Sequence, residues 1–313
     1  MPYYLGIDGG GTKTTCAVGD ESHVLATATT GPSNIVRVGE SRARESLQKS
    51  VLQACAAAGI TPAQVVHTCV GGSGAARPEL AAAVRGFLAQ VLPGPIDVVG
   101  DMEIALEAAF DTGPGVLVIA GTGSIAYGRS PQGVTARAGG WGFAIGDEGS
   151  AHWIGRETVA AILRASDMSS DAAENVLHGE LAAAFCKTWQ VASLTELARV
   201  ANSIPPPDFA ALFPIIAASR DVLGVQVLSS AGRELAQVAS VVIQRLFTPD
   251  DLPPVPVAMT GGVFRYAALV REDFYNELRR LDPRAEINPQ VIEPVEGALR
   301  RARRAAAGAV GAR

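Results

Sequence analysis

Short apolar segments alternate with polar or glycine-rich turns at the start of the chain. Residues 3–8 and 14–18 are apolar and β-branched runs separated by the glycine-rich segment 9–12, and a third such run at 24–30 follows the polar residues 20–22. Runs of this length and composition are typical of strands. The pattern therefore predicts three successive strands, the first two joined as a hairpin by a glycine-rich turn.

A helical period follows these strands. In residues 40–58 the apolar side chains of Leu47, Val51, Leu52 and Cys55 fall on one helical face, and Gly59 suits the position after a helix end. The pattern then predicts a strand, a helix, a strand and a helix, at 65–70, 80–91, 96–99 and 102–110. This order is typical of a mixed sheet covered by helices, a layered α/β domain of the ribonuclease-H type.

The pattern begins again after the turn at 111–114. Residues 116–119 are an apolar run, 121–124 a glycine-rich turn and 125–127 a second apolar run. Although few residues are identical, the order matches that of residues 5–18, which indicates duplication of one domain.

The second copy contains a long helical insertion. Residues 153–247 are mostly helical in pattern, with a break at the prolines 205–207. A strand at 255–259 leads into a turn at 260–262, and an Ala/Arg-rich helix runs from Pro294 to the end of the chain. The helical segment predicts a large α-helical addition to the second sheet.

The repeat predicts two domains. We expect the first to comprise residues 1–113, joined by the C-terminal helix at 295–313, and the second to comprise residues 114–294 with the insertion. A chain of 313 residues is long enough for two cores at about 150 residues each. The predicted fold class is α/β, with two ribonuclease-H-like domains and a cleft between them.

Composition and charge narrow the classes of protein. The chain is 48% hydrophobic and 18% charged, which is too apolar for a disordered chain. Its net charge of −5 does not favour a nucleic-acid or membrane partner. We interpret the one basic cluster as a solvated helix end; it comprises Arg300, Arg301, Arg303 and Arg304.

The cysteines and the N-terminus indicate a reducing compartment. Cys16, Cys55, Cys69 and Cys186 lack the close pairs of metal or redox motifs, so we expect reduced thiols in the core. Residues 1–4 lead directly into a strand without a leader pattern, and no segment reaches the roughly 20 apolar residues of a membrane span. We therefore expect a cytoplasmic protein.

The two glycine-rich hairpin turns are the candidate chemical features. If they face each other across a cleft, their backbone N–H groups can bind one polyanion, such as a nucleoside triphosphate. Glycine lets the phosphate oxygens approach the backbone, although each turn could also be only a tight hairpin. Further donors are available from Thr12, Lys13, Thr122 and Ser124.

Other phosphate-binding loops do not fit the first turn. Gly6 and Gly11 have the spacing of a P-loop, but Thr12 occupies the position of the required lysine, and a strand follows. A dinucleotide fingerprint must open a helix within a parallel βαβ unit. The predicted hairpin therefore excludes both a P-loop and a dinucleotide-binding fingerprint at this turn.

Eight ordered motifs resemble those of a known group. They are Gly6-Ile7-Asp8-Gly9-Gly10-Gly11-Thr12, Gly31-Pro32-Ser33-Asn34, Gly71-Gly72-Ser73-Gly74, Gly100-Asp101, Ala120-Gly121-Thr122-Gly123-Ser124, Gly139-Gly140-Trp141-Gly142, Gly146-Asp147-Glu148-Gly149-Ser150 and Thr260-Gly261-Gly262-Val263. In this order they resemble the sugar kinase/heat-shock/actin superfamily and, within it, the N-acetylglucosamine kinase branch of the BadF/BadG-type ATPases. The resemblance spans residues 5 to 264, with no motif in 165–255.

The resemblance implies an actin-like ATPase fold, ATP and Mg²⁺. Asp101, where a strand ends and a helix begins, is the implied catalytic base, although an aspartate there could also cap the helix. Asp8 is the implied Mg²⁺ ligand, or else a plain acid at a strand end. The implied ATP-binding residues are Gly10, Gly11, Thr12, Lys13, Gly121, Thr122, Gly123, Gly261 and Gly262.

The resemblance also implies an amino-sugar substrate. The implied sugar-binding residues are Asn34, Gly72, Ser73, Asp101, Ser124, Trp141, Gly142 and Asp147, although Trp141 could instead belong to the core. We expect a homodimeric hexosamine kinase that phosphorylates the 6-hydroxyl of N-acetylglucosamine. The alternatives are a glucosamine kinase, an ATPase that activates an acyl-CoA dehydratase-type partner, and a non-catalytic sensor.

Overall fold

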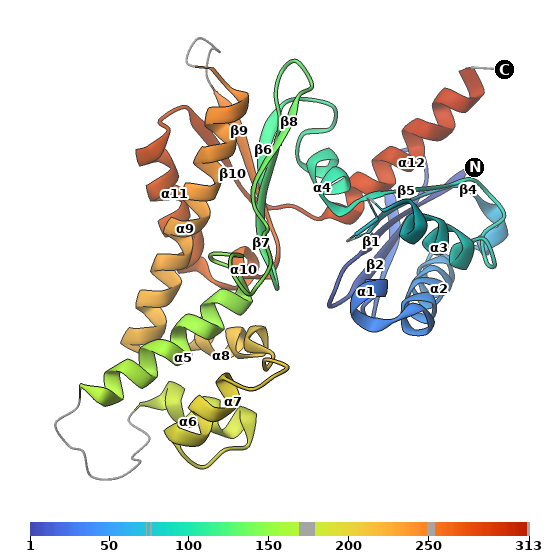
Figure 1. Ribbon diagram of the computed structural model, residues 1–313. Helices are drawn as coiled ribbons and strands as arrows, with labels where there is room; N and C mark the ends of the chain where they lie inside the picture. Colours follow the sequence, from blue (N-terminus) through green and yellow to red (C-terminus); the bar gives the residue numbers. More distant parts are fainter. Residues whose placement is uncertain (73, 76, 169–178, 249–253, 312–313) are drawn as a thin grey trace. The chain divides into compact units, whose positions relative to one another are not determined.

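The computed structural model describes residues 1–72, 74–75, 77–168, 179–248 and 254–311 (Figure 1). The chain divides into two compact units. Unit 1 comprises Met1–Gly113 and Ile292–Arg313, and unit 2 comprises Pro114–Val291. Each unit has its own five-stranded sheet.

The sheet of unit 1 has the strand order β3-β2-β1-β4-β5. The strands are β1 (Tyr3–Gly9), β2 (Thr14–Gly19), β3 (Val24–Thr30), β4 (Val65–Gly72) and β5 (Ile96–Gly100). β1 and β2 form the predicted antiparallel hairpin, β3 continues it, and β1, β4 and β5 run parallel. The three initial strands predicted from the sequence are confirmed.

Helices cover both faces of this sheet (Figure 1). α2 (Glu40–Ala57) and α3 (Pro78–Leu88) lie on one face, and α4 (Asp101–Phe110) and α12 (Pro294–Gly311) lie on the other. Unit 1 also contains the short helix α1 (Ile35–Val38) and the 3₁₀ turn η1 (Pro62–Gln64). Leu52 of α2, predicted on the apolar face, is 49% exposed, so its placement on that face is wrong. Successive side chains of β1 point to opposite faces of the sheet, as in any β-strand. Leu5 packs in a core with Leu47 of α2 and Leu88 of α3, whereas Tyr4 packs with Ile104 of α4 and Leu299 of α12.

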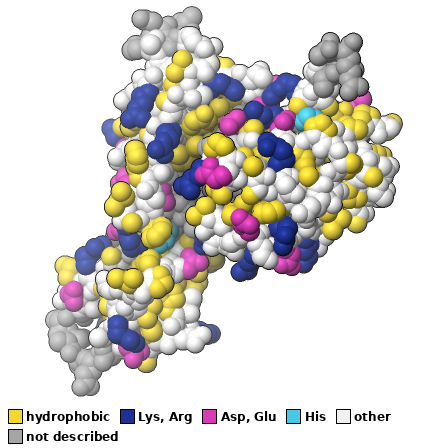
Figure 2. Space-filling model, turned by 45° about the vertical axis from the view of Figure 1, so that its right-hand side comes forward, with side chains coloured by type: hydrophobic (Ala, Val, Ile, Leu, Met, Phe, Trp, Pro, Cys, Tyr) yellow, Lys and Arg dark blue, Asp and Glu magenta, His cyan; other side chains and the backbone are white. Residues whose placement is uncertain are grey.

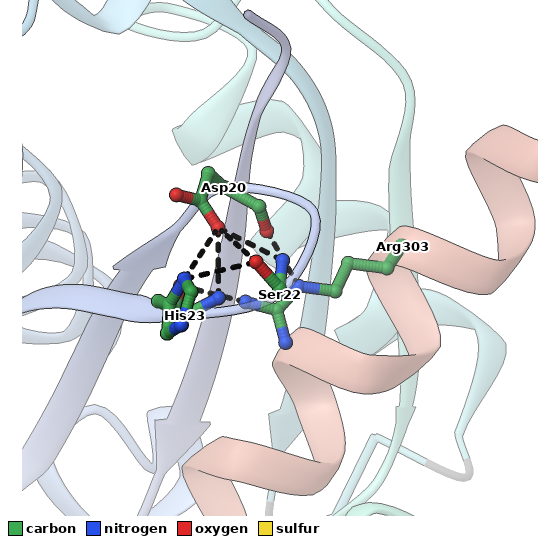
Figure 3. Close-up of polar contacts among 4 residues, drawn as sticks. All are labelled: Asp20, Ser22, His23 and Arg303. Carbon is green, nitrogen blue, oxygen red and sulfur yellow. Dashed lines mark hydrogen bonds and ion pairs between the residues drawn. The ribbon is translucent and has the colours of Figure 1, made fainter.

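Polar contacts fix α12 to the rest of unit 1. The Arg303 guanidinium donates to the carbonyl oxygens of Asp20 and His23, each at 2.7 Å, and the Asp20 carboxylate closes the same turn by accepting from the His23 backbone N–H at 2.7 Å (Figure 3). Arg301 pairs with Glu103 at 3.2 Å, and Arg304 pairs with Glu107. The interpretation of this arginine cluster as a solvated helix end is therefore wrong, because its members bind other elements.

The sheet of unit 2 repeats the topology of the first. Its order is β10-β9-β6-β7-β8, with β6 antiparallel to β7, β7 antiparallel to β8, and β6, β9 and β10 parallel. The strands are β6 (Gly115–Ala120), β7 (Ser124–Arg129), β8 (Thr135–Gly139), β9 (Val255–Thr260) and β10 (Ala285–Val291). Two sheets with the same order and directions agree with the predicted duplication, and the sequence pattern missed β8 and β10.

The predicted helical insertion lies between β8 and β9. It comprises α5 (Ala151–Asp167), α6 (Glu180–Trp189), α7 (Leu194–Ala201), η2 (Phe209–Leu212), α8 (Phe213–Ala218) and α9 (Val222–Leu246), while α10 (Gly262–Tyr266) and α11 (Ala268–Leu281) join β9 to β10. Among the described residues no single helix is long and apolar enough to cross a membrane; η2 and α8 together with α9 pass that test of length and composition only as a pair bent by 109°.

Charged side chains of both signs are mixed on the surface of the protein. On the face shown in Figure 2, Lys and Arg side chains are interspersed with Asp and Glu side chains rather than gathered in one continuous area.

All four cysteines are free and buried, which confirms the prediction of core thiols. Burial raises the pKa of the Cys55 thiol to about 11 and that of Cys69 to about 12, so both remain protonated near neutral pH.

Candidate functional site

The strand register of unit 1 brings several candidate residues to one edge of the sheet. Gly9 at the end of β1 pairs with Gly72 at the end of β4, and Gly72 pairs with Gly100 at the end of β5. Asp8 precedes the first of these glycines and Asp101 follows the last. Residues from three distant parts of the sequence therefore lie together at the carboxyl ends of the parallel strands, where ligands bind in open α/β sheets.

The glycine turn between β1 and β2 is fixed by a neighbouring loop. The Gly10 N–H donates to the Lys13 carbonyl at 3.0 Å, and the Ser33 N–H donates to the Gly10 carbonyl at 3.1 Å. The Thr14 hydroxyl lies 2.8 Å from the Ser33 hydroxyl. These bonds hold residues 31–34 against the turn and place Asn34 beside it.

Asp101 is the first residue of α4. Its Oδ1 accepts from the Met102 backbone N–H at 2.9 Å. The N-cap position belongs to Gly100, whose N–H donates to the Glu103 carboxylate at 3.2 Å. The Asp101 carboxylate therefore satisfies one backbone N–H of the first helical turn from the position after the N-cap, a role that can coexist with catalysis. The strand end and helix start predicted around it are confirmed.

The Asp8 carboxyl lies in an unfavourable environment for its charge. Burial, followed by the nearby charge of Asp101 and then that of Glu293, raises its pKa to about 6, against the opposing effect of Lys13. Glu293 reaches this edge from the segment before α12, and the sequence pattern gave no sign of it. Two neighbouring carboxylates create a negative potential that a cation or a proton relieves.

The carboxylates fit a magnesium ion bound together with phosphate. Mg²⁺ in phosphoryl-transfer sites is held by one or two carboxylates and by substrate phosphates rather than by a full protein cage. Asp8 and Asp101 provide such a pair. In the described part of the chain no cluster of three or more His, Cys, Asp or Glu side chains could hold a metal by itself, so an ion here would need the phosphates as ligands.

A small apolar pocket adjoins the same edge. It has a volume of about 20 Å³, room for about one water molecule. Gly9, Ser33 and Gly72 border it at the site, and side chains of the core behind them complete it, namely Ile35, Leu47, Val70, Ala75, Leu80 and Val84.

Unit 2 has a corresponding glycine turn at the edge of its own sheet. The Gly121 N–H donates to the Gly123 carbonyl at 2.9 Å, and the Gly121 carbonyl accepts from Ala151 at the start of α5 at 2.8 Å. Gly261 follows the neighbouring strand β9 with φ +106°, and a Cβ there would lie 2.5 Å from the Ala120 carbonyl carbon. Only glycine fits this approach of two backbones.

Asp147 connects this turn to the loop after β8. It is only 8% exposed, has φ +60°, and accepts from the Gly142 N–H at 3.3 Å. A Cβ on Gly123 would lie 2.7 Å from Asp147 Oδ2, so the glycine leaves room for the carboxylate. Burial raises the Asp147 pKa, although hydrogen bonds from the Gly142 and Ser124 N–H groups lower it. The Ser124 hydroxyl donates to the Glu148 carbonyl at 2.7 Å.

Trp141 is a surface residue. Its side chain is 67% exposed, and the Arg137 guanidinium carbon lies 4.7 Å from the ring centre. The alternative interpretation of Trp141 as a core residue is therefore wrong. An exposed ring is available to stack on the apolar face of a ligand.

The predicted site residues form one set in each unit. Unit 1 holds Asp8, Gly10, Gly11, Thr12, Lys13, Asn34, Gly72 and Asp101, and unit 2 holds Gly121, Thr122, Gly123, Ser124, Trp141, Gly142, Asp147, Gly261 and Gly262. Ser73 lies outside the described residues. The sequence analysis missed Glu293, whose charge acts on Asp8.

Comparison with known proteins places the chain in a family. The model of the BadF/BadG/BcrA/BcrD ATPase family matches residues 5–299. The chain belongs to this family. Membership confirms the predicted resemblance and implies the use of ATP.

Individual relatives and solved structures match nearly the whole chain. An N-acetylmuramic acid/N-acetylglucosamine kinase of Clostridium acetobutylicum is 30% identical over 96% of this chain and 97% of its own length. The structure of a proposed N-acetylglucosamine kinase from Chromobacterium violaceum is 25% identical, with a TM-score of 0.71 over 96% and 98% of the two chains. A ROK family glucokinase from Streptomyces griseus, at 14% identity, has a TM-score of 0.63 over 96% and 99%. Together with the two matching sheets, these likenesses confirm the α/β, actin-like ATPase fold class.

Proposed function

We propose that this member of the BadF/BadG/BcrA/BcrD family is an ATP-dependent hexosamine kinase that phosphorylates the 6-hydroxyl of N-acetylglucosamine. The observation that carries the proposal is the register of the unit 1 sheet, in which Gly9, Gly72 and Gly100 form one row and Asp101 follows it directly. A carboxylate is thereby close to a glycine turn suited to phosphate. The likeness to the N-acetylmuramic acid/N-acetylglucosamine kinase of C. acetobutylicum supports an amino sugar as the acceptor.

In the proposed mechanism Asp101 is the general base. Its carboxylate accepts the proton of the 6-hydroxyl while that oxygen bonds to the γ-phosphorus and the bond from phosphorus to the ADP oxygen breaks. Bound Mg²⁺ would supply positive charge to the phosphates, with Asp8 as its protein ligand. The products are the sugar 6-phosphate, ADP and a protonated Asp101, which returns its proton to solvent.

The remaining site residues are proposed to bind the two substrates. The glycine turns at 10–13 and 121–123, together with Gly261 and Gly262, would offer backbone N–H groups to ATP. Polar groups and the exposed Trp141 ring would bind the sugar, from Asn34, Gly72, Ser73, Ser124, Gly142 and Asp147. A homodimer and a cytoplasmic location stay predictions.

The activator alternative finds little support in the cysteines. A cluster shared across a dimer needs thiolates at the surface. All four thiols are buried, and burial raises the pKa of Cys55 to about 11 and of Cys69 to about 12. Glucosamine stays an alternative substrate, because it differs from N-acetylglucosamine only at the 2-substituent.

A coupled ADP-release assay tests the proposal. Mg-ATP is offered with N-acetylglucosamine, glucosamine, N-acetylmannosamine, glucose or no sugar, and the phosphorylated carbon is identified by NMR of the product. We expect the fastest turnover with N-acetylglucosamine and phosphate on carbon 6. ATP hydrolysis that is independent of every sugar would contradict the kinase assignment, and a phosphate on another carbon would contradict the 6-hydroxyl.

Replacing the proposed base gives a sharper test. We expect Asp101→Asn to lower kcat on the order of 10²–10⁴-fold, because the amide cannot accept the hydroxyl proton. The KM values should change far less, since the side chains have nearly the same shape. Asp167→Asn, at the exposed end of α5, is the matched control and should keep wild-type turnover. Full activity in Asp101→Asn would remove Asp101 from the mechanism.

A further inference from the structure

Arg37 lies across the glycine turn of unit 1. A Cβ built on Gly11 would be 3.4 Å from Arg37 Nη1 and 3.6 Å from its Cδ, so both the tip and the stem of the arginine side chain pass over this glycine. An alanine Cβ at position 11 would make ordinary van der Waals contact with the arginine. The Arg37 side chain therefore lies directly beside the glycine turn that is proposed to bind phosphate.

The backbone around Arg37 is held in place. Arg37 belongs to the short helix α1, and its N–H donates to Asn34 Oδ1 at 3.3 Å. The preceding Ser33 N–H donates to the Gly10 carbonyl at 3.1 Å. Two hydrogen bonds thus connect the segment that carries Arg37 to the turn and to Asn34, which fixes the backbone of Arg37 beside the turn.

The Arg37 guanidinium has no protein partner among the residues that the structure describes. Other arginines of unit 1 donate to carbonyl or carboxylate oxygens, as Arg303 does to Asp20 and His23. The backbone carbonyl of Lys13 closes the same turn, and the charge of Lys13 acts on the neighbouring Asp8 carboxyl, so a second cation lies near this edge of the sheet. A positioned guanidinium with free donors next to backbone N–H groups and a second cation suits an anionic ligand.

We propose that Arg37 binds an oxyanion of the substrates, through the paired donors that fit carboxylate and phosphate oxygens. The inference rests on the proposed kinase function and adds a specificity-determining residue to it. The oxyanion has two possible sources. One is the phosphate of ATP, and the other is a carboxylate on the acceptor sugar, such as the lactyl group that distinguishes N-acetylmuramic acid from N-acetylglucosamine.

The test compares full-length wild type with Arg37→Gln, Arg37→Lys and the control Arg164→Gln. Arg164 is exposed on α5 about 20 Å along that helix from its first residue. Turnover is measured with N-acetylglucosamine and with N-acetylmuramic acid, varying ATP and each sugar in turn. We expect Arg37→Gln to lose on the order of 10–100-fold in kcat/KM for the substrate that carries the oxyanion. Arg37→Lys should recover part of the loss, because it keeps the charge without the paired donors.

The pattern of loss identifies the source. If Arg37→Gln lowers kcat/KM for ATP by a similar factor with either sugar as acceptor, Arg37 binds the phosphate of ATP. A loss confined to N-acetylmuramic acid assigns it to the sugar carboxylate. Arg37→Gln within twofold of Arg164→Gln for both sugars and for ATP would overturn the inference while leaving the kinase function intact.

Binding measurements separate this inference from the proposed function. If wild type phosphorylates neither sugar, the kinase assignment fails, and calorimetric titration with ATP and with N-acetylmuramic acid then decides the role of Arg37. Weaker binding of either ligand by Arg37→Gln supports the inference, and equal or absent binding in both proteins overturns it. Unfolding midpoints of the variants are compared first, and we expect no change because Arg37 is exposed.

Discussion

At the scale of single residues, Asp147 of unit 2 is a buried acid held in a restricted conformation. Its backbone has φ +60°, its side chain is buried, and one oxygen accepts from the Gly142 N–H. Burial raises the pKa of this carboxyl above that of an ordinary aspartate. Ionisation of Asp147 therefore costs more in the folded state than in the unfolded state.

This cost predicts how Asp147→Asn responds to pH. Asparagine tolerates positive φ and keeps an acceptor oxygen for Gly142. Below the ordinary aspartate pKa of about 4, both proteins are neutral at this position, so their stabilities should be similar. As pH rises through the raised pKa of the folded state, wild type loses stability relative to the variant. Thermal unfolding without ligands at pH values from 4 to 7 should show a melting-temperature difference that grows with pH in favour of the variant.

Asp167→Asn serves as the control, because it makes the same chemical change at an exposed position at the end of α5. A melting-temperature difference between Asp147→Asn and wild type that is constant with pH, or one that favours wild type at pH 7, would contradict the role of burial. In that case the hydrogen bonds from the Gly142 and Ser124 N–H groups, which lower the pKa of Asp147, would outweigh the effect of burial.

At the scale of elements, α12 depends on glycine for its close contact with α4. A Cβ on Gly297 would lie 2.5 Å from the Ala108 backbone nitrogen and would also overlap the Ile104 carbonyl, whereas a Cβ on Gly308 of the same helix meets nothing within 4 Å. The two helices can therefore pack only if position 297 lacks a side chain. Gly308 offers the same substitution in the same helix without that contact.

The two substitutions should act in opposite directions. We expect Gly297→Ala to lower the free energy of unfolding by about 1–3 kcal/mol or more, because backbone atoms must move. Gly308→Ala should raise it by up to about 1 kcal/mol, because alanine favours helix. Denaturant unfolding of both variants measures the difference. Equal effects would mean that α12 does not pack against α4 in this way.

At the scale of the whole molecule, the two units differ in how the chain builds them. The described core of unit 2 comes entirely from residues within Pro114–Val291. Unit 1 needs both ends of the chain, because Tyr4, Ala17 and Ile104 pack on Ala298 and Leu299 of α12. We propose that unit 2 is a domain able to fold alone and that residues 1–113 are incomplete without α12.

Fragments test this difference. Residues 114–291 expressed alone should unfold cooperatively on heating, as followed by circular dichroism. Residues 1–113 alone should show a weaker or absent transition, and fusion of residues 292–313 through a flexible Gly/Ser linker should restore it. If 1–113 unfolds with the same midpoint as the fused protein, α12 contributes nothing to unit 1.

Local patterns determined much of this protein. The spacing of apolar residues and the nearby turn residues predict the strands at 3–8 and 14–18 and the helix at 40–58. They also predict the position of Asp101 between a strand and a helix. Each of these features depends only on residues that are close together in the sequence. The repeated order of strands and glycine turns likewise indicated two similar sheets. The ordered motifs then pointed to the family.

Only the tertiary structure decided which distant residues meet. The short edge strands β8 and β10 and the attachment of α12 to unit 1 depend on pairing and packing with segments far away in the chain. The approach of Glu293 to Asp8, the fit of Asp147 against Gly123 and the passage of Arg37 over Gly11 arise in the same way. The spacing of apolar residues in a sequence shows which face of a single helix or strand is buried. The partner of that face is chosen by shape, burial and charge across the folded chain.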